Sequence, residues 1–346
     1  MMDLPGLFLP TGVGSLPHGD PDRAVRAVLT GCPSLPYWPQ LPGRTFLENM
    51  YVQFAAGLPA SDISGEKLHV DCGEAMLAGA EEFYARFLSE DLASFAIPAD
   101  RAAGLARILA EEGEVYPAVK GQVTGPVSFG LMVTDRGKRP LYYDPMGRDV
   151  LVKHLLRVAQ WQVGQLKRLS PNVILVVDEP YLASLGSAIL SLSREEVVAS
   201  LDEIFEGLPD ALCGIHCCAN TDWGLVLSTR VRYLSFDAFE YIDSLLLYPG
   251  EVAQFLEREG KLAFGIVPTS GEAIGRETAE TLGGRMESIL RKFADRGIPE
   301  EKVVKSALIT PACGLGTVQE EEAERAIRLA ADLSALLRER YGEARS

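Results

Sequence analysis

The octapeptide Val173–Pro180, V-I-L-V-V-D-E-P, carries the clearest fold signal in this sequence. Its apolar run is followed by an acidic pair and a proline, a pattern typical of a buried strand that ends in a turn. Similar runs recur along the chain with helix-like segments between most of them, and this alternation favours a parallel sheet or barrel. The eight expected strands are Leu7–Val13, Lys67–Asp71, Val115–Val123, Val173–Val177, Ala211–Ile215, Tyr233–Phe236, Leu262–Val267 and Val303–Ile309.

The predicted fold class is α/β, a (β/α)8 TIM-type barrel that forms a single domain over residues 1–346. Such barrels routinely use about 250 or more residues as one unit, and a hydrophobic content of 47% suffices for a large core. The segment Pro33–Pro59 is rich in proline and aromatic residues, and we expect it to form a long excursion after the first strand, either a lid over the barrel mouth or a packed loop. The expected helices include Asp100–Glu112, Asp149–Leu169, Ser193–Phe205 and Val318–Tyr341.

The overall charge argues against two classes of partner. The net charge is −15, and an acidic surface repels both nucleic-acid phosphates and anionic membranes. No apolar run approaches the roughly 18–20 residues that a membrane helix needs. The segment Met1–Pro10 lacks a basic region followed by a long apolar core, so we expect no secretory signal and a cytoplasmic location.

Polar side chains stand at or just past the C-terminal ends of the expected strands. In a (β/α)8 barrel these ends converge on one face of the molecule, and barrel active sites lie on that face. The sequence therefore predicts one shared site. Its candidate residues are Ser15, Asp178, His216, Asp237 and Cys313.

The tripeptide His216-Cys217-Cys218 indicates a metal site. Alternate residues of an extended segment face the same way, so His216 and Cys218 can point at one ion while Cys217 faces away. Cys313 can add a thiolate and Asp237 a carboxylate, and zinc favours these ligands with imidazole in tetrahedral geometry. The competing interpretation is a set of ordinary buried cysteines beside a structural histidine. In a long cytosolic chain, however, cysteines more often bind metal or act chemically than form disulfides.

The charge of this ligand set indicates its chemistry. Two thiolates and a carboxylate give the site excess negative charge, which weakens zinc as a Lewis acid toward water. The same site suits the capture of a small thiol, because a free thiol has a pKa of about 8.5 and metal coordination ionises it. The expected cofactor is Zn2+, and the expected substrate is a small thiol.

Six segments, in the same order, resemble motifs of the C-terminal catalytic half of cobalamin-independent methionine synthase, in the uroporphyrinogen decarboxylase/methionine synthase-like superfamily. The family motifs are T-x-I-G-S-F-P, K-G-x-x-T-G-P-V, I-D-E-P, H-x-C, I-E and N-P-D-C-G-L. The corresponding segments are Thr11–Pro17, Lys120–Val127, Val177–Pro180, His216–Cys218, Phe236–Asp237 and Thr310–Leu315.

This resemblance implies a zinc-dependent methyltransferase that methylates a small thiol such as homocysteine. It implies that His216, Cys218 and Cys313 are zinc ligands, with Asp237 in the place of the family's glutamate ligand. It also implies that Ser15 holds the homocysteine carboxylate and that Asp178 holds the amine. A second amine ligand, Glu48, lies in a segment similar to the family's E-x-N-D-M-V-E-Y-F, but two residues shorter.

Four departures from the family leave the methyl donor open. The chain has no room for the N-terminal half that helps the full-length synthase to bind folate. Ser128–Met132 lacks the tryptophan that contacts folate in the family, and Val267–Ser270 lacks the family's histidine. Asp237 is shorter than glutamate, and Glu240 is a less well aligned substitute. A methylated corrinoid, the donor of short single-barrel relatives, and a folate both remain candidate donors.

Two further functions remain open on the sequence alone. The first is a non-enzymatic zinc- or thiol-binding barrel, which the missing tryptophan and histidine favour. The second is a decarboxylase of the uroporphyrinogen type, which needs no metal and holds substrate carboxylates with basic residues. Arginine and lysine do not cluster in the expected strand-end loops, and this disfavours the decarboxylase.

Overall fold

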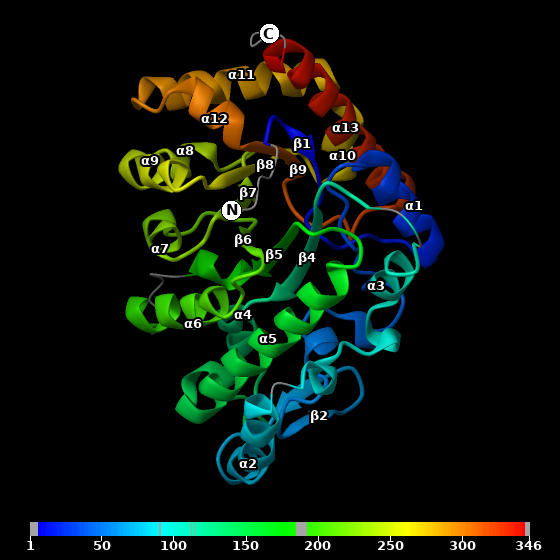
Figure 1. Ribbon diagram of the computed structural model, residues 1–346, viewed down its shortest axis with the longest axis vertical. Coiled ribbons are helices and arrows are strands. Elements are labelled where there is room, and N and C mark those ends of the chain that lie inside the picture. The colour runs from blue at the N-terminus through cyan, green and yellow to red at the C-terminus, as the bar shows by residue number, and fades with distance from the viewer. Residues whose placement is uncertain (1–5, 90, 112, 114, 185–191, 343–346) are drawn as a thin grey trace.

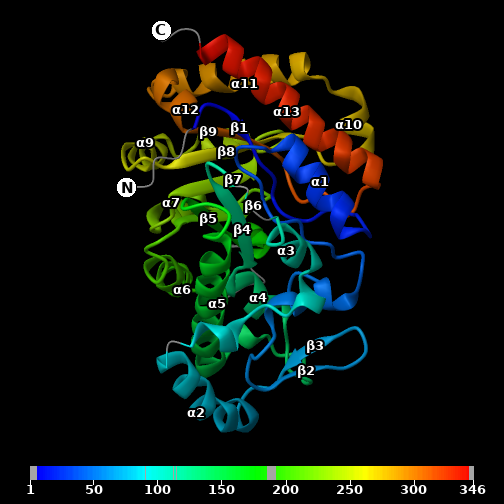
Figure 2. The same ribbon diagram turned by 45° about the vertical axis from the view of Figure 1, so that its right-hand side comes forward.

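The centre of the molecule is a curled parallel sheet of seven strands in the order β1-β9-β8-β7-β6-β5-β4. The computed structural model describes residues 6–89, 91–111, 113, 115–184 and 192–342. Helices surround the sheet (Figure 1; Figure 2). The strands of this sheet are β1 (Leu9–Pro10), β4 (Val119–Thr124), β5 (Val173–Asp178), β6 (Leu212–Cys217), β7 (Tyr233–Asp237), β8 (Lys261–Val267) and β9 (Ala307–Pro311).

The helices begin where the sequence supplies caps and prolines. Ser193 Oγ accepts a hydrogen bond from Glu196 N at the start of α6, and proline occupies the first turn of α1, α4, α5 and α9. The α-helices are α1 (Pro21–Gly31), α2 (Glu74–Leu88), α3 (Ala103–Ile108), α4 (Pro126–Met132), α5 (Pro145–Leu166), α6 (Arg194–Glu206), α7 (Trp223–Ser228), α8 (Ile242–Leu245), α9 (Pro249–Glu257), α10 (Gly271–Arg276), α11 (Ala279–Asp295), α12 (Glu300–Ser306) and α13 (Glu320–Gly342). The 3-10 turns are η1 (Phe46–Glu48), η2 (Val52–Phe54), η3 (Leu92–Phe95), η4 (Ala99–Arg101), η5 (Leu141–Tyr143) and η6 (Pro180–Ser184).

The extended segment 34–40 connects the two edges of the sheet. On one side, Lys120 N in β4 donates to Pro36 O at 2.8 Å. On the other side, Gln40 N donates to Gly14 O, just past β1, at 3.1 Å. Isolated parallel bridges mark both contacts. The first part of the expected excursion is thus neither a lid nor a loop, because it runs along the sheet between β1 and β4.

Prolines explain why this segment does not form a regular strand. A proline stands at every third position from 33 to 42, and each one removes a backbone donor from the ladder. Leu35 nevertheless joins a small apolar cluster with residues on or beside all seven strands. The prediction of an α/β fold with a parallel, curled sheet is confirmed. The complete eight-stranded barrel is not confirmed, since seven regular strands pair in this sheet of the described chain.

Four strand predictions differ clearly from the structure in their bounds or their place. Strand β1 covers only Leu9–Pro10 of the expected Leu7–Val13, and β4 begins at Val119 and not at Val115. Lys67–Asp71 does not belong to the central sheet: β3 (Leu68–Val70) pairs antiparallel with β2 (Ser61–Ile63) in a separate hairpin. This hairpin lies with α2 at the end of the molecule opposite α11 and α13 (Figure 1; Figure 2). The polar residues between these short runs form a turn, and the run at 68–70 is only partly buried, unlike the central strands.

Val303–Ile309 was predicted as one strand, but its first part ends helix α12, and the strand begins at Ala307. The helix starts directly after Pro299 with two glutamates in its first turn, a favourable helix beginning that outweighs the β-branched Val303 and Val304.

The expected helices 149–169, 193–205 and 318–341 correspond to α5, α6 and α13. The expected helix Asp100–Glu112 is shorter, with η4 and α3 covering its first part, and its last residue lies outside the described residues. No helix in the described part of the chain has both the length and the apolar character needed to cross a bilayer.

Candidate metal site

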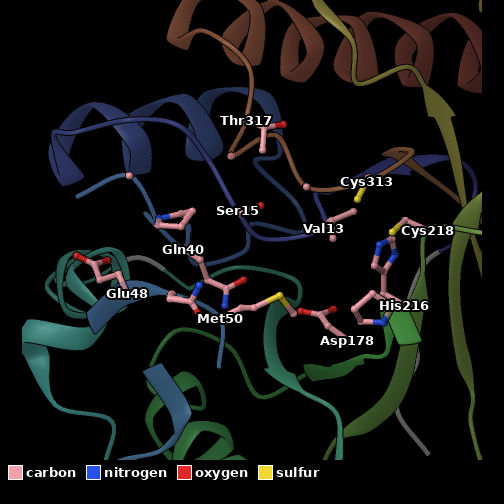
Figure 3. A pocket seen from close by; sticks show the side chains of 16 residues that line it. Val13, Ser15, Gln40, Glu48, Met50, Asp178, His216, Cys218, Cys313 and Thr317 are labelled. Atoms are coloured by element: carbon pink, nitrogen blue, oxygen red, sulfur yellow. The ribbon is translucent and has the colours of Figure 1, made fainter. Parts of the chain in front are cut away.

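Three side chains that could hold a metal ion converge at the C-terminal ends of two strands. His216 lies in β6, Cys218 follows β6 directly, and Cys313 follows β9. Strands β7 and β8 separate β6 from β9 in the sheet, yet the ligand atoms of the three residues all lie within 4.8 Å of one another. The curl of the sheet brings these distant tips together (Figure 3).

The imidazole of His216 is oriented for metal binding. Its Nδ1 is hydrogen bonded to Ser235 Oγ at 2.9 Å, and Ser235 is its register partner on β7. Its Nε2 is buried and has no hydrogen-bond partner among the described residues. An imidazole held through one nitrogen, with the other nitrogen free beside two thiols, is the arrangement that zinc sites use. The donor set therefore fits a zinc ion.

The neighbours of the two thiols shift their pKa values in opposite directions. Cys313 and His216 lower the pKa of Cys218, whereas Cys218 and burial raise the pKa of Cys313. Of the two thiols, Cys218 therefore loses its proton more easily. Cys217 is buried and directs its Sγ to Ala219 O at 3.5 Å, so it is separate from the cluster.

Asp237 is not a member of the three-residue cluster in the described structure. It ends β7, and its Oδ1 accepts a hydrogen bond from Glu240 N at 2.9 Å. Burial is the main cause that raises the pKa of Asp237 to about 6, and the negative charges of Glu240 and Cys218 contribute. One oxygen of the Asp237 carboxylate is thus bonded within the turn that follows β7. Glu240 is exposed.

A cavity of about 490 Å³ extends from the cluster. Its lining includes Ser15, Glu48 and Asp178, so it brings together every candidate residue except Asp237. Among the described residues that line it there is no arginine or lysine. Val13 and Met50 add apolar surface to the lining (Figure 3).

Ser15 lies beside the loop that carries Cys313. A Cβ on Gly314 would come within 2.1 Å of Ser15 Oγ, so only glycine permits this approach. The backbone fixes the same contact, because Leu315 N donates to Ser15 O at 2.9 Å. The hydroxyl of Ser15 is therefore held against Gly314, the residue that follows Cys313.

The two candidate amine ligands lie in different parts of the cavity. Asp178 ends β5 next to His216 in register, and its buried Oδ1 has no hydrogen-bond partner among the described residues. Burial raises the pKa of Asp178 to about 6, against the lowering effect of His216 and Lys120. Glu48 lies on η1 on the far side of the cavity from the cluster (Figure 3). It is ion-paired with Arg44, and burial raises its pKa.

The structure adds residues that sequence reasoning missed. Lys120 is 1% exposed, and its Nζ donates to Val13 O at 2.6 Å, beneath the cavity. Burial lowers the pKa of Lys120 to about 8. The sequence feature that could have identified Lys120 as a site residue is its place in the K-G-x-x-T-G-P-V segment. Gln40 also lines the cavity, and no motif pointed to it.

Glu179 has a structural role that differs from that of its neighbour Asp178. Its carboxylate accepts hydrogen bonds from Val127 N, Ser128 N and Ser128 Oγ at 2.9, 2.8 and 2.6 Å, at the start of α4. Consecutive residues at a strand end face opposite sides. One acid of the Asp-Glu-Pro motif therefore faces the cavity, and the other fixes α4.

Comparison with solved structures supports the fold. A putative vitamin-B12 independent methionine synthase from Listeria monocytogenes matches 97% of this chain and 99% of its own, with a TM-score of 0.60 and 12% identity. A methyltransferase from Methanosarcina mazei matches 95% of this chain and 94% of its own, with a TM-score of 0.53 and 13% identity. The neighbours thus include the kind of protein that the motifs resemble, and they share the fold over nearly the whole chain.

A third structure, a B12-independent methionine synthase from Shewanella sp. W3-18-1 in complex with selenomethionine, matches over a shorter span. The match covers 65% of this chain and 64% of that protein, with 15% identity and a TM-score of 0.46, and we draw no argument from it. No protein-family model and no curated protein sequence matches the chain.

Proposed function

We propose that this chain is a zinc-dependent methyltransferase that transfers a methyl group to the sulfur of a small thiol such as homocysteine. The donor is a methylated corrinoid or a folate. The observation that carries the proposal is the convergence of His216, Cys218 and Cys313 at one end of a cavity without arginine or lysine in its described lining. Zinc bound there would ionise an incoming thiol and keep its sulfur nucleophilic at neutral pH.

The chain's own residues prepare the site for this chemistry. Ser235 holds the His216 ring so that Nε2 faces the two thiols. The proposed acidic ligand, Asp237, lies outside the three-residue cluster, and its Oδ1 accepts a hydrogen bond from Glu240 N. Asp237 is therefore the least favourably placed of the four proposed ligands.

Substrate positioning is assigned to Ser15, Asp178 and Glu48. Ser15 Oγ, next to the Cys313 loop, is a donor for the substrate carboxylate. Asp178 offers an unpaired, buried carboxylate oxygen to the substrate ammonium. Glu48 contributes negative charge from the far side of the cavity. A thiolate held in this way would attack the methyl group in line. The S–CH3 bond forms, the bond from the methyl group to the corrinoid cobalt or to the folate nitrogen breaks, and the demethylated donor leaves with that electron pair. Proximity would supply much of the rate, without a separate general base for the thiol.

The site supports the two alternatives less well. A uroporphyrinogen-type decarboxylase needs cationic side chains for several carboxylates, and the described cavity lining has none. The non-enzymatic zinc- or thiol-binding barrel rests on the missing tryptophan and histidine. The segment that lacks the tryptophan, Ser128–Met132, forms most of helix α4 in the structure, and its residues 128–131 are buried. The missing side chain therefore concerns the donor and not the cluster of His216, Cys218 and Cys313.

Metal analysis of the purified protein tests the metal site. We expect about one zinc per chain in the wild type. The zinc content of Cys218→Ser and of Cys313→Ser should be more than tenfold lower, because the two thiolates supply much of the affinity for zinc. Cys217→Ser is the matched control, since Cys217 is adjacent in sequence but outside the cluster. A wild type without zinc, or serine variants that keep it, would contradict the proposal.

Methyl transfer is tested separately on the zinc-loaded protein. Homocysteine is supplied with methylcobalamin or with methyltetrahydrofolate, and methionine formation is compared with the uncatalysed rate. We expect catalysis with one of these donors. Zinc-loaded protein that binds homocysteine but catalyses neither reaction would favour the non-enzymatic alternative.

A further inference from the structure

Gln40 lies in the part of the cavity between Glu48 and Asp178 (Figure 3). It belongs to the proline-interrupted segment that connects the sheet edges, and its backbone is fixed on both sides: Gln40 N donates to Gly14 O at 3.1 Å, and Gln40 O accepts from Leu16 N at 2.8 Å. The side chain is 5% exposed. The Gln40 amide is therefore a fixed part of the cavity wall.

A chain of hydrogen bonds sets which end of the Gln40 amide faces the cavity. The chain starts at Arg101 O, a backbone carbonyl that can only accept, and Gln53 Nε2 donates to it. Gln53 must then present its oxygen to Gln40, and Gln40 Nε2 donates to that oxygen at 2.8 Å. The carbonyl of Arg101 thus fixes the orientation of both glutamine amides. The remaining atom, Gln40 Oε1, accepts no hydrogen bond from the described residues.

Close contacts connect this oxygen with the loop that carries Cys313. A Cβ on Gly14 would lie 2.7 Å from Gln40 Oε1, so the oxygen packs against the residue that precedes Ser15. Ser15 Oγ in turn packs against Gly314, the residue after Cys313. The contacts therefore run without a gap from the amide oxygen through Ser15 to the thiol loop.

We propose that Gln40 determines specificity for thiols that carry an α-amino group, because its Oε1 accepts a hydrogen bond from the substrate ammonium. The inference rests on the proposed function and adds a residue to it. An ammonium group has three N–H donors. Asp178 Oδ1 is a buried acceptor without a described partner, Gln40 uses its Nε2 and not its Oε1 in the bond to Gln53, and both residues line the same cavity. A thiol without the amine leaves both acceptors desolvated and unpaired, which disfavours its binding.

The test measures binding of two thiols to the zinc-loaded protein by titration calorimetry. One is homocysteine, and the other is 4-mercaptobutanoate, which differs only by the missing amine. The wild type should bind homocysteine at least about tenfold more tightly. Gln40→Met keeps the length of the side chain but removes the acceptor, so it should weaken homocysteine binding about tenfold and change 4-mercaptobutanoate binding less than twofold.

Gln53→Met provides a second variant, which leaves Gln40 in place but removes the bond that orients it. It should weaken homocysteine binding by a smaller factor than Gln40→Met and again spare the analogue. Equal binding of both thiols by the wild type, or equal weakening of both by Gln40→Met, would overturn the role of Gln40 while the proposed function stands. A zinc-loaded wild type that binds neither thiol would instead overturn the proposed function, and this inference with it.

Discussion

At the scale of single residues, the buried histidine of α5 links the fold to pH. His154 is fully buried, its Nε2 donates to Phe54 O at 2.8 Å, and its Nδ1 has no partner among the described residues. Burial lowers the pKa of His154 to about 4, from an ordinary value of 6.5. The folded state therefore binds fewer protons than the unfolded state between these pH values. The protonation of His154 thus leaves the unfolding free energy unchanged above pH 6.5 and lowers it as the pH falls toward 4.

We expect the His154→Gln variant to lose this pH dependence, because the glutamine amide can donate to Phe54 O but does not titrate. Between pH 7.5 and pH 5, the wild type should lose about 2 kcal/mol more unfolding free energy than the variant, since each pKa unit corresponds to about 1.4 kcal/mol. Urea unfolding of both proteins at the two pH values measures the difference. Parallel losses in the two proteins would show that His154 does not carry the effect.

At the scale of elements, helix α3 packs directly on the segment that connects the sheet edges. A Cβ on Gly104 would lie 1.9 Å from Pro39 O, so Gly104→Ala must separate the two backbones. We expect a loss of about 1–3 kcal/mol in unfolding free energy, which is typical of overpacking. Because Pro39 precedes Gln40, homocysteine binding should weaken as well. Urea unfolding and calorimetry measure the two effects.

The matched control is Gly164→Ala, at an exposed position in the last turn of α5, where a Cβ meets nothing within 4 Å. This substitution should stabilise the protein by about 0.5–1 kcal/mol, because it removes only the conformational freedom of glycine. If both alanine variants were stabilised, the contact between α3 and the connecting segment would not be tight.

The same elements show what the sequence could predict about the fold. The run at 173–177 predicts a strand well because a strand buried on both faces needs continuous apolar residues. The segment 34–40 could not be recognised, because its prolines are typical of loops and its hydrogen bonds come from residues far along the chain. The run at 67–71 has the composition of a strand, but its pairing with a local partner depends on burial that no short pattern reveals.

At the scale of the whole molecule, the meeting of the candidate ligands depends on the order of strands in the sheet. Parallel strands present their C-terminal ends at one edge, so residues after β6 and β9 could be predicted to share that edge. Motif order also indicated Ser15 and Asp178 as neighbours of the cavity. The bond that occupies Asp237 and the hydrogen bonds that orient Gln40 depend on local geometry, and neither is visible in a residue pattern.

If zinc binds as proposed, it connects the end of β6 with the end of β9, which β7 and β8 separate in the sheet, and its removal should lower the stability of the whole molecule. A ligand that binds only the folded state adds about 4 kcal/mol at a thousand times its Kd, and each kcal/mol shifts Tm by about 2 °C in a large domain. We therefore expect a chelator to lower the Tm of the wild type and of Cys217→Ser by about 5 °C or more. Differential scanning calorimetry with and without the chelator measures this shift.

Cys313→Ser should already melt at the lower temperature and should not respond to the chelator, because one of the two connected strand ends has lost its ligand. Added zinc should restore the wild type, whereas magnesium should not, since thiolates are poor ligands for magnesium. A chelator shift of the same size in Cys313→Ser would mean that the stabilising ion binds elsewhere, and the proposed link between β6 and β9 would be wrong.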